Sequence, residues 1–260
     1  MSPATLSGRC IAVTRPRAQC EALAAGIAAR GGTALVFPLI AIEGIADSDQ
    51  IRAARRALAG YDLAFFVSPN AVEHGVAALG GRAAWPPGLR VAGVGAGTRA
   101  ALEQRGFEGV IAPRSGADSE AVLALPEFSP GALVGRRLLI VRGDGGRDLL
   151  GHQAERRGAE VSYLSCYRRR LPAADAGGLL DVVRDARLSA LVVTSSEALG
   201  NLAAIVGDEG LAALRQLPLF VPHPRIAERA GEYGFESIIS TGPGDSGILS
   251  GLDAHFQHVG

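Results

Sequence analysis

The chain has 260 residues, of which 48% are hydrophobic, 5% aromatic and 20% charged. This composition is typical of a folded globular protein and excludes the disordered and fibrous classes. The 26 basic residues, all of them arginine, balance 26 acidic residues, so the chain lacks the overall positive charge that non-specific nucleic-acid binding needs. Without lysine, Schiff-base catalysis and a lysine-containing phosphate loop are also excluded.

Cysteine usage and the apolar segments indicate a compartment. Cys10, Cys20 and Cys166 form an odd set without a CxxC pair, which predicts neither a disulfide framework nor a zinc site. No basic segment followed by an apolar one opens the chain, and the longest apolar stretch, 34–42, is interrupted by Pro38. We therefore expect a cytoplasmic protein with no membrane segment.

An internal duplication organises the sequence. Three pairs of matching residues are each separated by 127 positions: Arg15 and Arg142, Ser68 and Ser195, and Asp118 and Asp245. Each pair occurs in a similar context, such as an apolar run just before the arginine. Because the spacing does not drift, we interpret the two halves as copies of one unit.

The first copy predicts strands near 10–14, 34–43, 63–67, 90–94 and 109–112, each followed by a turn signal and a helical pattern. Continuous apolar strands alternating with helices favour an α/β fold with parallel sheets. We predict two similar flavodoxin-like lobes. The second strand is long and contains Pro38, so 35–42 and its counterpart 161–168 are the expected two-stranded linker between the lobes.

Ligands of parallel α/β sheets bind at the carboxyl ends of the strands. The loops expected there are rich in hydroxyls, glycine and arginine, and they are 14–16, 68–70, 93–98, 142–147, 194–196 and 222–225. These residue types suit an anionic ligand. The glycine loop 93–97 does not fit a dinucleotide site, because Thr98 breaks the fingerprint and no acidic residue ends the next strand.

Several residues allow two interpretations. The run Arg168–Arg170 is either a solvated charge run or part of a ligand site beside the linker. Tyr167 is either a core aromatic or a hydroxyl presented to a cleft. His223, between two prolines, either contacts a ligand or simply begins a helix. The histidines show no convincing metal-ligand spacing, and no nucleophile stands out.

Together these motifs resemble the uroporphyrinogen-III synthase family over residues 10–252. The resemblance lies in the order and spacing of Thr14-Arg15-Pro16, the segment 61–72, the glycine run to Thr98, Arg142-Gly143 with Gly146-Arg147, and Tyr167-Arg168. It implies one lobe made of 1–38 and 170–260, with a second lobe, 39–169, inserted in it. It also implies the reaction, in which hydroxymethylbilane loses water and closes to uroporphyrinogen III with its last ring inverted.

The resemblance further implies the roles of individual residues. Tyr167 matches the tyrosine that assists loss of the substrate hydroxyl. The expected substrate contacts are Arg15, Ser68, Asn70, Gly95, Thr98, Arg142, Gly146, Arg147, Ser195, Ser196, His223 and Arg225. Arg225 replaces an expected threonine. No cofactor or metal is implied, and we expect a monomer that receives its substrate from hydroxymethylbilane synthase.

Two other functions remain open from the residues. A non-catalytic two-lobe binder of a small anionic ligand would use the same duplication. A nucleotide-sugar glycosyltransferase would need acidic residues at the strand ends, where Asp144 alone is expected.

Overall fold

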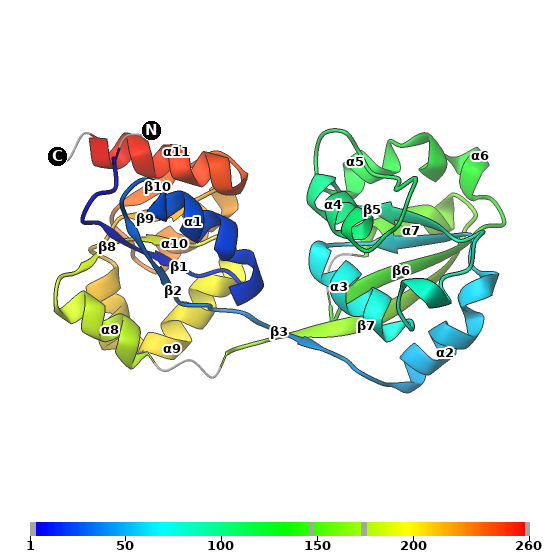
Figure 1. Cartoon of the computed structure of the whole chain (residues 1–260), viewed down its shortest axis with the longest axis horizontal. Helices are drawn as coiled ribbons and strands as arrows, with labels where there is room; N and C mark the ends of the chain where they lie inside the picture. The colour runs from blue at the N-terminus through cyan, green and yellow to red at the C-terminus, as the bar shows by residue number, and fades with distance from the viewer. Residues whose placement is uncertain (1–3, 146–147, 173–175, 258–260) are drawn as a thin grey trace. The chain divides into compact units, whose positions relative to one another are not determined.

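Two five-stranded sheets with helices on both sides form the fold of the computed structural model, which describes residues 4–145, 148–172 and 176–257 (Figure 1). The chain divides into two units. Unit 1 consists of Met1–Ala41 and Arg170–Gly260, and unit 2 of Ile42–Arg169. The chain therefore passes between the units twice, once after Ala41 and once after Arg169.

The sheet of unit 1 has the strand order β10-β9-β8-β1-β2. Its strands are β1 (Cys10–Val13), β2 (Thr33–Val36), β8 (Leu188–Val192), β9 (Leu219–Val221) and β10 (Ile238–Ser240), and the neighbouring strands pair in parallel. Its helices are η1 (Arg17–Gln19), α1 (Glu21–Ala28), α8 (Gly177–Arg184), α9 (Ser196–Leu214), α10 (Pro224–Glu232) and α11 (Gly244–Gln257). Buried apolar residues of α1 and α11 pack against one face of the sheet, and α8 and α9 lie across its other side (Figure 1).

The sheet of unit 2 has the order β3-β7-β6-β4-β5. Its strands are β3 (Ala41–Gly44), β4 (Leu63–Phe66), β5 (Arg90–Gly93), β6 (Arg137–Gly143) and β7 (Glu160–Arg170). Its helices are α2 (Asp49–Ala57), η2 (Leu58–Gly60), α3 (Pro69–Ala78), η3 (Arg82–Ala84), α4 (Ala96–Gln104), α5 (Ser119–Leu123), η4 (Pro126–Phe128), α6 (Pro130–Leu133) and α7 (Leu149–Arg156). Because side chains alternate along a strand, Phe66 faces a core with α2, α3 and α4, whereas Phe65 faces a core with α5, α6 and α7.

The duplication is visible in the topology. In chain order, unit 1 has the flavodoxin-type strand order 2-1-3-4-5, and the segments 127 residues away from β2, β1, β8 and β9 are β7, β6, β4 and β5, which follow the same order in unit 2. The pairing register agrees as well: Ile11 lies opposite Ala34 in unit 1, and Leu138 lies opposite Val161 in unit 2. Each unit thus combines the first two strands of one repeat with the later strands of the other.

Two predicted strands differ from the structure. The strand expected at 34–43 is divided into β2 and β3, with Pro38 between them, because proline cannot donate a backbone hydrogen bond to a sheet. The first part belongs to the sheet of unit 1 and the second lies beside β7 in unit 2. The strand expected at 109–112 is reduced to a single parallel bridge between Ala92 and Ile111.

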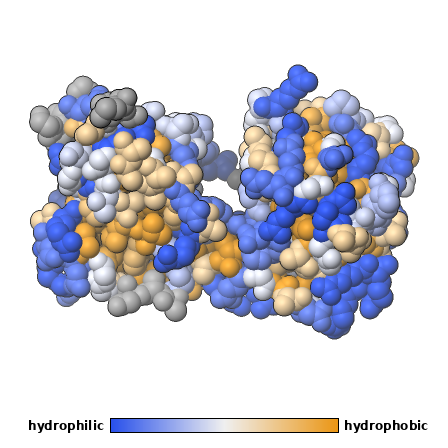
Figure 2. All heavy atoms as spheres, viewed as in Figure 1, coloured by the Kyte–Doolittle hydropathy of each residue, from blue (hydrophilic) through white to orange (hydrophobic). Residues whose placement is uncertain are grey.

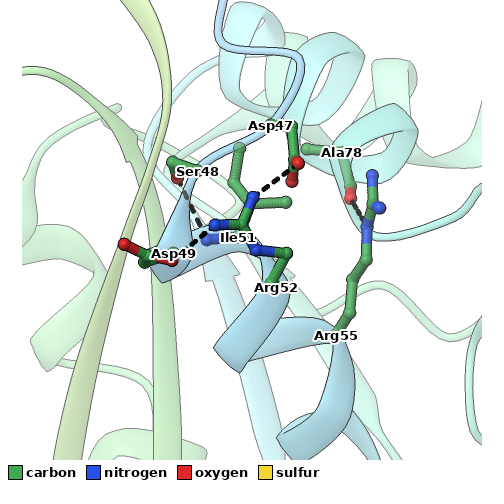
Figure 3. Close-up of polar contacts among 7 residues, drawn as sticks. All are labelled: Asp47, Ser48, Asp49, Ile51, Arg52, Arg55 and Ala78. Atoms are coloured by element: carbon green, nitrogen blue, oxygen red, sulfur yellow. Dashed lines mark hydrogen bonds and ion pairs between the residues drawn. The ribbon is translucent and has the colours of Figure 1, made fainter.

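Helix α2 is fastened to α3, the helix that follows β4 (Figure 3). At its start, Ser48 caps the helix by accepting a hydrogen bond from the N–H of Ile51 at 3.1 Å. Near its end, the Nε of Arg55 donates to the carbonyl of Ala78, the last residue of α3. The remaining contacts drawn there are the ion pairs of Arg52 with Asp47 and Asp49. Helix α3 is therefore held at its C-terminal end, opposite the end that faces the candidate site.

Hydrophilic and apolar side chains are interspersed on the face drawn in Figure 2. Val134 and Leu171 are the large apolar side chains exposed among the described residues. None of the helices in the described part of the chain combines the length and apolar character needed to cross a membrane. Within the same residues, no group of three histidine, cysteine or acidic side chains is placed to hold a metal ion.

Candidate active site

The predicted site residues gather at the carboxyl edges of the two sheets, in one group for each unit. In unit 2 they follow β4 and β5 or lie near the ends of β6 and β7, and they are Ser68, Asn70, Gly95, Thr98, Arg142 and Tyr167. In unit 1 they follow β1, β8 and β9, and they are Arg15, Ser195, Ser196, His223 and Arg225. Gly146 and Arg147 lie outside the described residues.

Tyr167 is the largest fully buried side chain of the chain's described part, with 1% of its surface exposed. Its hydroxyl lies 3.2 Å from the Oγ of Ser68, and either oxygen could be the donor. Its ring also contacts the ring of His74 in α3, with 5.8 Å between the ring centres. The ring of Tyr167 is therefore a core aromatic, as one of the two interpretations predicted, and its hydroxyl lies against the half-buried Ser68. A functional role of that hydroxyl stays a prediction.

A bulge in β7 determines the direction of Tyr167. In the pairing with β6, Ser165 lies opposite Arg142 and Tyr167 lies opposite the next residue, Gly143, so Cys166 is an extra residue in β7. Cys166 and Tyr167 consequently both face the core that contains α3. Strict alternation would have turned Tyr167 toward the opposite face, where Tyr163 lies.

Burial raises the pKa of the Cys166 thiol to about 12. The thiol lies 3.3 Å from the carbonyl oxygen of Arg142 and stays protonated at neutral pH. Cys166 therefore supplies packing beside Tyr167 rather than a thiolate nucleophile.

The serines of the two groups begin helices. Ser68 accepts a hydrogen bond from the N–H of Ala71 at 3.1 Å, and Ser195 accepts one from the N–H of Ala198 at the same distance. Ser196 follows as the exposed first residue of α9. Both serine loops therefore present the N-terminal end of a helix at the carboxyl edge of a sheet, where the helix dipole favours an anion.

The next loop of each unit differs. In unit 2, Gly95 precedes α4, and Thr98 is buried in the first turn of that helix with 2% exposed. In unit 1, His223 caps α10, because its Nδ1 accepts a hydrogen bond from the backbone N–H of Arg225 at 3.1 Å. His223 thus has the helix-start role that the sequence left open, and Arg225 extends from the same turn as an exposed residue.

The two repeated arginines form ion pairs. Arg15 pairs with Asp245 in the first turn of α11, and Arg142 pairs with Asp148 just before α7. Each arginine side chain is 14% exposed. Hydrogen bonding and charge from Arg142 lower the pKa of Asp148 below its usual value. Both arginines are therefore built into the edge of their sheet by a carboxylate.

Sequence reasoning did not predict His74 or Asp148 at this edge, and it placed Gly143 in a ligand loop without indicating its contact with Tyr167. His74 and Gly143 contact Tyr167, and Asp148 pairs with Arg142. The repeat singles out Asp245, the partner of Arg15, because an aspartate, Asp118, also stands 127 positions earlier. By the same repeat, Asp118 would be the partner of Arg142. Asp118 instead caps α5 by accepting a hydrogen bond from the N–H of Ala121.

This architecture defines a class: a duplicated α/β protein of two flavodoxin-type units, with polar helix starts and paired arginines at the carboxyl edges of parallel sheets. Within that class, residues 21–250 match the model of the family described as uroporphyrinogen-III synthase HemD. The chain belongs to the uroporphyrinogen-III synthase family. It is thus an enzyme of tetrapyrrole biosynthesis.

Two relatives show how far the similarity extends. The chain is 35% identical to the uroporphyrinogen-III synthase of Salmonella typhimurium and 33% identical to that of Escherichia coli. Each alignment covers 88% of this chain and 93% of the relative. The similarity therefore includes both units.

Solved structures agree on the fold. A mutant uroporphyrinogen III synthase from Thermus thermophilus matches with a TM-score of 0.59 at 20% identity, covering 96% of this chain and 99% of the other. A uroporphyrinogen-III synthetase from Helicobacter pylori matches with a TM-score of 0.58 at 14% identity, covering 97% and 100%.

Proposed function

We propose that this chain converts hydroxymethylbilane into uroporphyrinogen III, and that the Tyr167–Ser68 pair at the carboxyl edge of unit 2 assists loss of the substrate hydroxyl. The 3.2 Å contact between these two hydroxyls supports the proposal. Family membership supports the reaction, in which a linear tetrapyrrole loses one molecule of water and closes with its last ring inverted.

Counting donor and acceptor positions indicates which hydroxyl of the Tyr167–Ser68 pair donates to the other. A serine hydroxyl has one donor and two acceptor positions. The Oγ of Ser68 already accepts from the N–H of Ala71, and the phenol O–H of Tyr167 can fill the second acceptor position. The proton of Ser68 is then left to be donated to the departing hydroxyl. Two hydroxyls in series polarise each other, which strengthens the donation to the leaving oxygen.

The reaction balances without another reactant. The carbon–oxygen bond breaks, and its electron pair leaves on oxygen. The freed carbon forms a bond with a pyrrole carbon, which loses a proton, and this proton and the departing hydroxide together make up one water. Ring closure is intramolecular, so positioning alone can contribute on the order of 7–11 kcal/mol. The chain therefore needs hydrogen-bond donors and a binding surface more than a strong acid or base.

We propose that the other predicted residues bind the carboxylates of the substrate. The exposed start of α9 at Ser196 and the start of α3 supply backbone N–H groups that suit a carboxylate. The proposed contacts in unit 2 are Asn70, Gly95, Thr98, Arg142, Gly146 and Arg147. Those in unit 1 are Arg15, Ser195, Ser196, His223 and Arg225. Among the proposed arginines that the structure describes, Arg15 and Arg142 pair with aspartates, whereas Arg225 is exposed and can meet a carboxylate without first leaving an ion pair.

The proposal also includes the setting in which the chain works. We propose a monomer in the cytoplasm that uses no cofactor and receives its substrate from hydroxymethylbilane synthase. The three free cysteines support a reducing compartment.

The test is incubation with freshly generated hydroxymethylbilane, followed by separation of the type I and type III products after oxidation to porphyrins. Spontaneous closure gives type I, so the parental chain should give type III in proportion to its concentration. A heat-denatured sample is the control. Tight binding of the tetrapyrrole with only the type I background would contradict the proposal.

A further inference from the structure

Gly143, the last residue of β6, lies against the ring of Tyr167. A Cβ atom at this position would lie 2.6 Å from Cε2 and 2.7 Å from Cζ of the tyrosine, and 3.1 Å from its hydroxyl oxygen. The backbone of Gly143 does not adopt the left-handed conformation that favours glycine. The absence of a side chain is therefore required by the tyrosine ring rather than by the backbone.

The bulge and the glycine act on the same side chain. Cys166 inserts one residue into β7, which turns Tyr167 toward the face of the sheet that carries α3 and Ser68. Gly143 leaves the space into which the turned ring fits. The backbone N–H of Asp144, the next residue, donates to the carbonyl of Tyr167 at 2.9 Å and holds the strand in this register.

Gln50 of α2 forms hydrogen bonds with backbone groups of β7 just before the bulge. Its side-chain amide donates to the carbonyl of Tyr163 at 2.8 Å and accepts the N–H of Ser165 at 3.2 Å. Beside it, the N–H of Ile45 donates to the carbonyl of Cys166 at 2.9 Å. The backbone on both sides of the bulge is thus fixed by defined partners.

Unit 1 lacks this device. The counterparts of Gly143 and Tyr167, 127 positions earlier, are Pro16 and Ile40. β1 ends at Val13 before it reaches Pro16, and β2 ends at Val36 before it reaches Ile40. The shared fold of the two units therefore does not require a glycine at the end of β6. The glycine and the bulge belong to the hydroxyl pair that only unit 2 carries.

We propose that Gly143 is a positioning residue for the reaction: together with the β7 bulge it sets the Tyr167 hydroxyl against Ser68, and any side chain at 143 breaks that contact. The inference rests on the proposed function of the Tyr167–Ser68 pair. It adds a residue that touches the tyrosine rather than the substrate, and it assigns a purpose to an irregularity in the strand.

The main experiment compares Gly143→Ala with the parental chain and repeats the comparison with Tyr167→Phe in both. Steady-state formation of the type III product gives kcat and KM. Gly143→Ala should lower kcat about tenfold to hundredfold, the scale on which small misplacements act, with little change in KM. In the Tyr167→Phe background the same substitution should change kcat by less than about threefold, because the hydroxyl it would displace is already gone.

Gly151→Ala is the matched control. A Cβ atom at Gly151 would lie 1.8 Å from the hydroxyl oxygen of Tyr163, so it creates a comparable glycine–tyrosine conflict in the same unit, on the other face of the sheet. It should lower the unfolding midpoint and leave kcat unchanged. Equal kcat losses in Gly143→Ala and Gly151→Ala would mean that any packing defect in unit 2 lowers activity, and the inference would fail.

A readout that does not depend on turnover separates this inference from the proposed function. With 13C at the tyrosine Cζ atoms, the signal missing in Tyr167→Phe identifies Tyr167, and Gly143→Ala should shift that signal more than those of the other tyrosines. An unshifted signal overturns the inference even if the chain shows no type III activity. A shifted signal in a chain without such activity leaves the positioning intact and removes only the proposed function.

Gln50→Ala covers the case in which Gly143→Ala does not fold. Gln50 is exposed, so its replacement should be tolerated while it frees the backbone beside the bulge. It should lower kcat severalfold and shift the Tyr167 signal. Gln216→Ala, which removes an exposed amide bonded to Glu236 in unit 1, should do neither. If Gln50→Ala matches Gln216→Ala in both measurements, the bulge does not position Tyr167.

Discussion

The carboxyl edges of the two units share a scaffold. Each has a serine that caps the helix after the third strand of a repeat: Ser68 after β4 in unit 2 and Ser195 after β8 in unit 1, with the same 3.1 Å hydrogen bond. Each has an arginine at the carboxyl end of the first strand of a repeat, Arg142 near the end of β6 and Arg15 just after β1, that is 14% exposed and paired with an aspartate. Features present in both copies can be explained by the fold alone.

The difference lies at the end of the second repeat strand. In unit 2, β7 continues through its bulge to Tyr167, whereas in unit 1 β2 stops at Val36 and the counterpart of the tyrosine is Ile40. One serine cap therefore carries a second hydrogen bond and the other does not. The comparison teaches that the duplication accounts for the serine caps and the paired arginines of both units, whereas the Tyr167–Ser68 pair, to which we assign the chemistry as a proposal, is an addition in unit 2.

The largest effect is expected from Tyr167→Phe. It removes one hydroxyl from the pair and almost no buried area, so the fold should persist. We expect the variant to lose about 1–3 kcal/mol of transition-state stabilisation, which lowers the rate of type III formation roughly 5- to 150-fold. Separation of the isomers measures it. A parental rate in a variant of parental stability would assign Tyr167 to the core alone.

The second prediction uses the serine caps as a matched pair. Ser68→Ala and Ser195→Ala each remove an N-cap hydrogen bond and should each lower the free energy of unfolding by about 0.5–2 kcal/mol. Only Ser68→Ala also removes the partner of the Tyr167 hydroxyl, so it should slow type III formation more than Ser195→Ala. Denaturant unfolding and isomer analysis of both variants provide the test, and equal activity losses would remove the distinction between the units.

Sequence patterns predicted the shared scaffold better than the difference. The constant spacing predicted the repeat that the matching strand order and register now display, and the parallel α/β class followed from apolar strands such as 63–67. The bulge at Cys166 could not be predicted, because it depends on pairing with β6 and on the partners that Gln50 supplies from a distant helix. For the same reason, the contact of Gly143 with the ring of Tyr167 could not be predicted from the glycine-rich loop 142–147.

The arginines were predicted as carboxylate ligands, and the structure adds their partners. Asp245 pairs with Arg15 and Asp148 pairs with Arg142. The repeat marks Asp245 through its counterpart Asp118, but it gives no signal for Asp148. The long-range contact of Tyr167 with Ser68, 99 positions apart, is of the same kind. Side-chain partners across a sheet edge depend on tertiary packing that no local pattern encodes.

The third prediction compares three arginines. Arg15→Ala and Arg142→Ala each leave an unpaired carboxylate at the edge that should bind the substrate carboxylates, so both should raise KM more than Arg225→Ala, which removes only an exposed charge. Exposed ion pairs contribute about 0–1 kcal/mol, so the increase for Arg225→Ala should be fivefold or less, roughly. KM is measured at low and at high salt. High salt should reduce the difference in KM between each variant and the parental chain. Unchanged KM in all three variants would mean that other groups bind the carboxylates.

The smallest effect concerns acid stability, which should distinguish unit 2. The pKa of Asp62 is lowered by the backbone N–H of Arg137 and the side chain of Arg136, and the pKa of Asp148 is lowered by Arg142. Because these pKa values are lower in the folded state than in the unfolded one, their stabilisation is present above the ordinary pKa of about 4 and is lost as the pH falls through the folded values. The only tryptophan, Trp85, is buried in unit 2, so its fluorescence reports unfolding of that unit. We expect the urea midpoint for unfolding of unit 2 to decrease as the pH is lowered from 6 to 3, and we expect Asp62→Asn to make this decrease smaller. A midpoint that is independent of pH in the parental chain, or a fall of the same size in Asp62→Asn, would show that the bond between Asp62 and the N–H of Arg137 does not set the acid stability of unit 2.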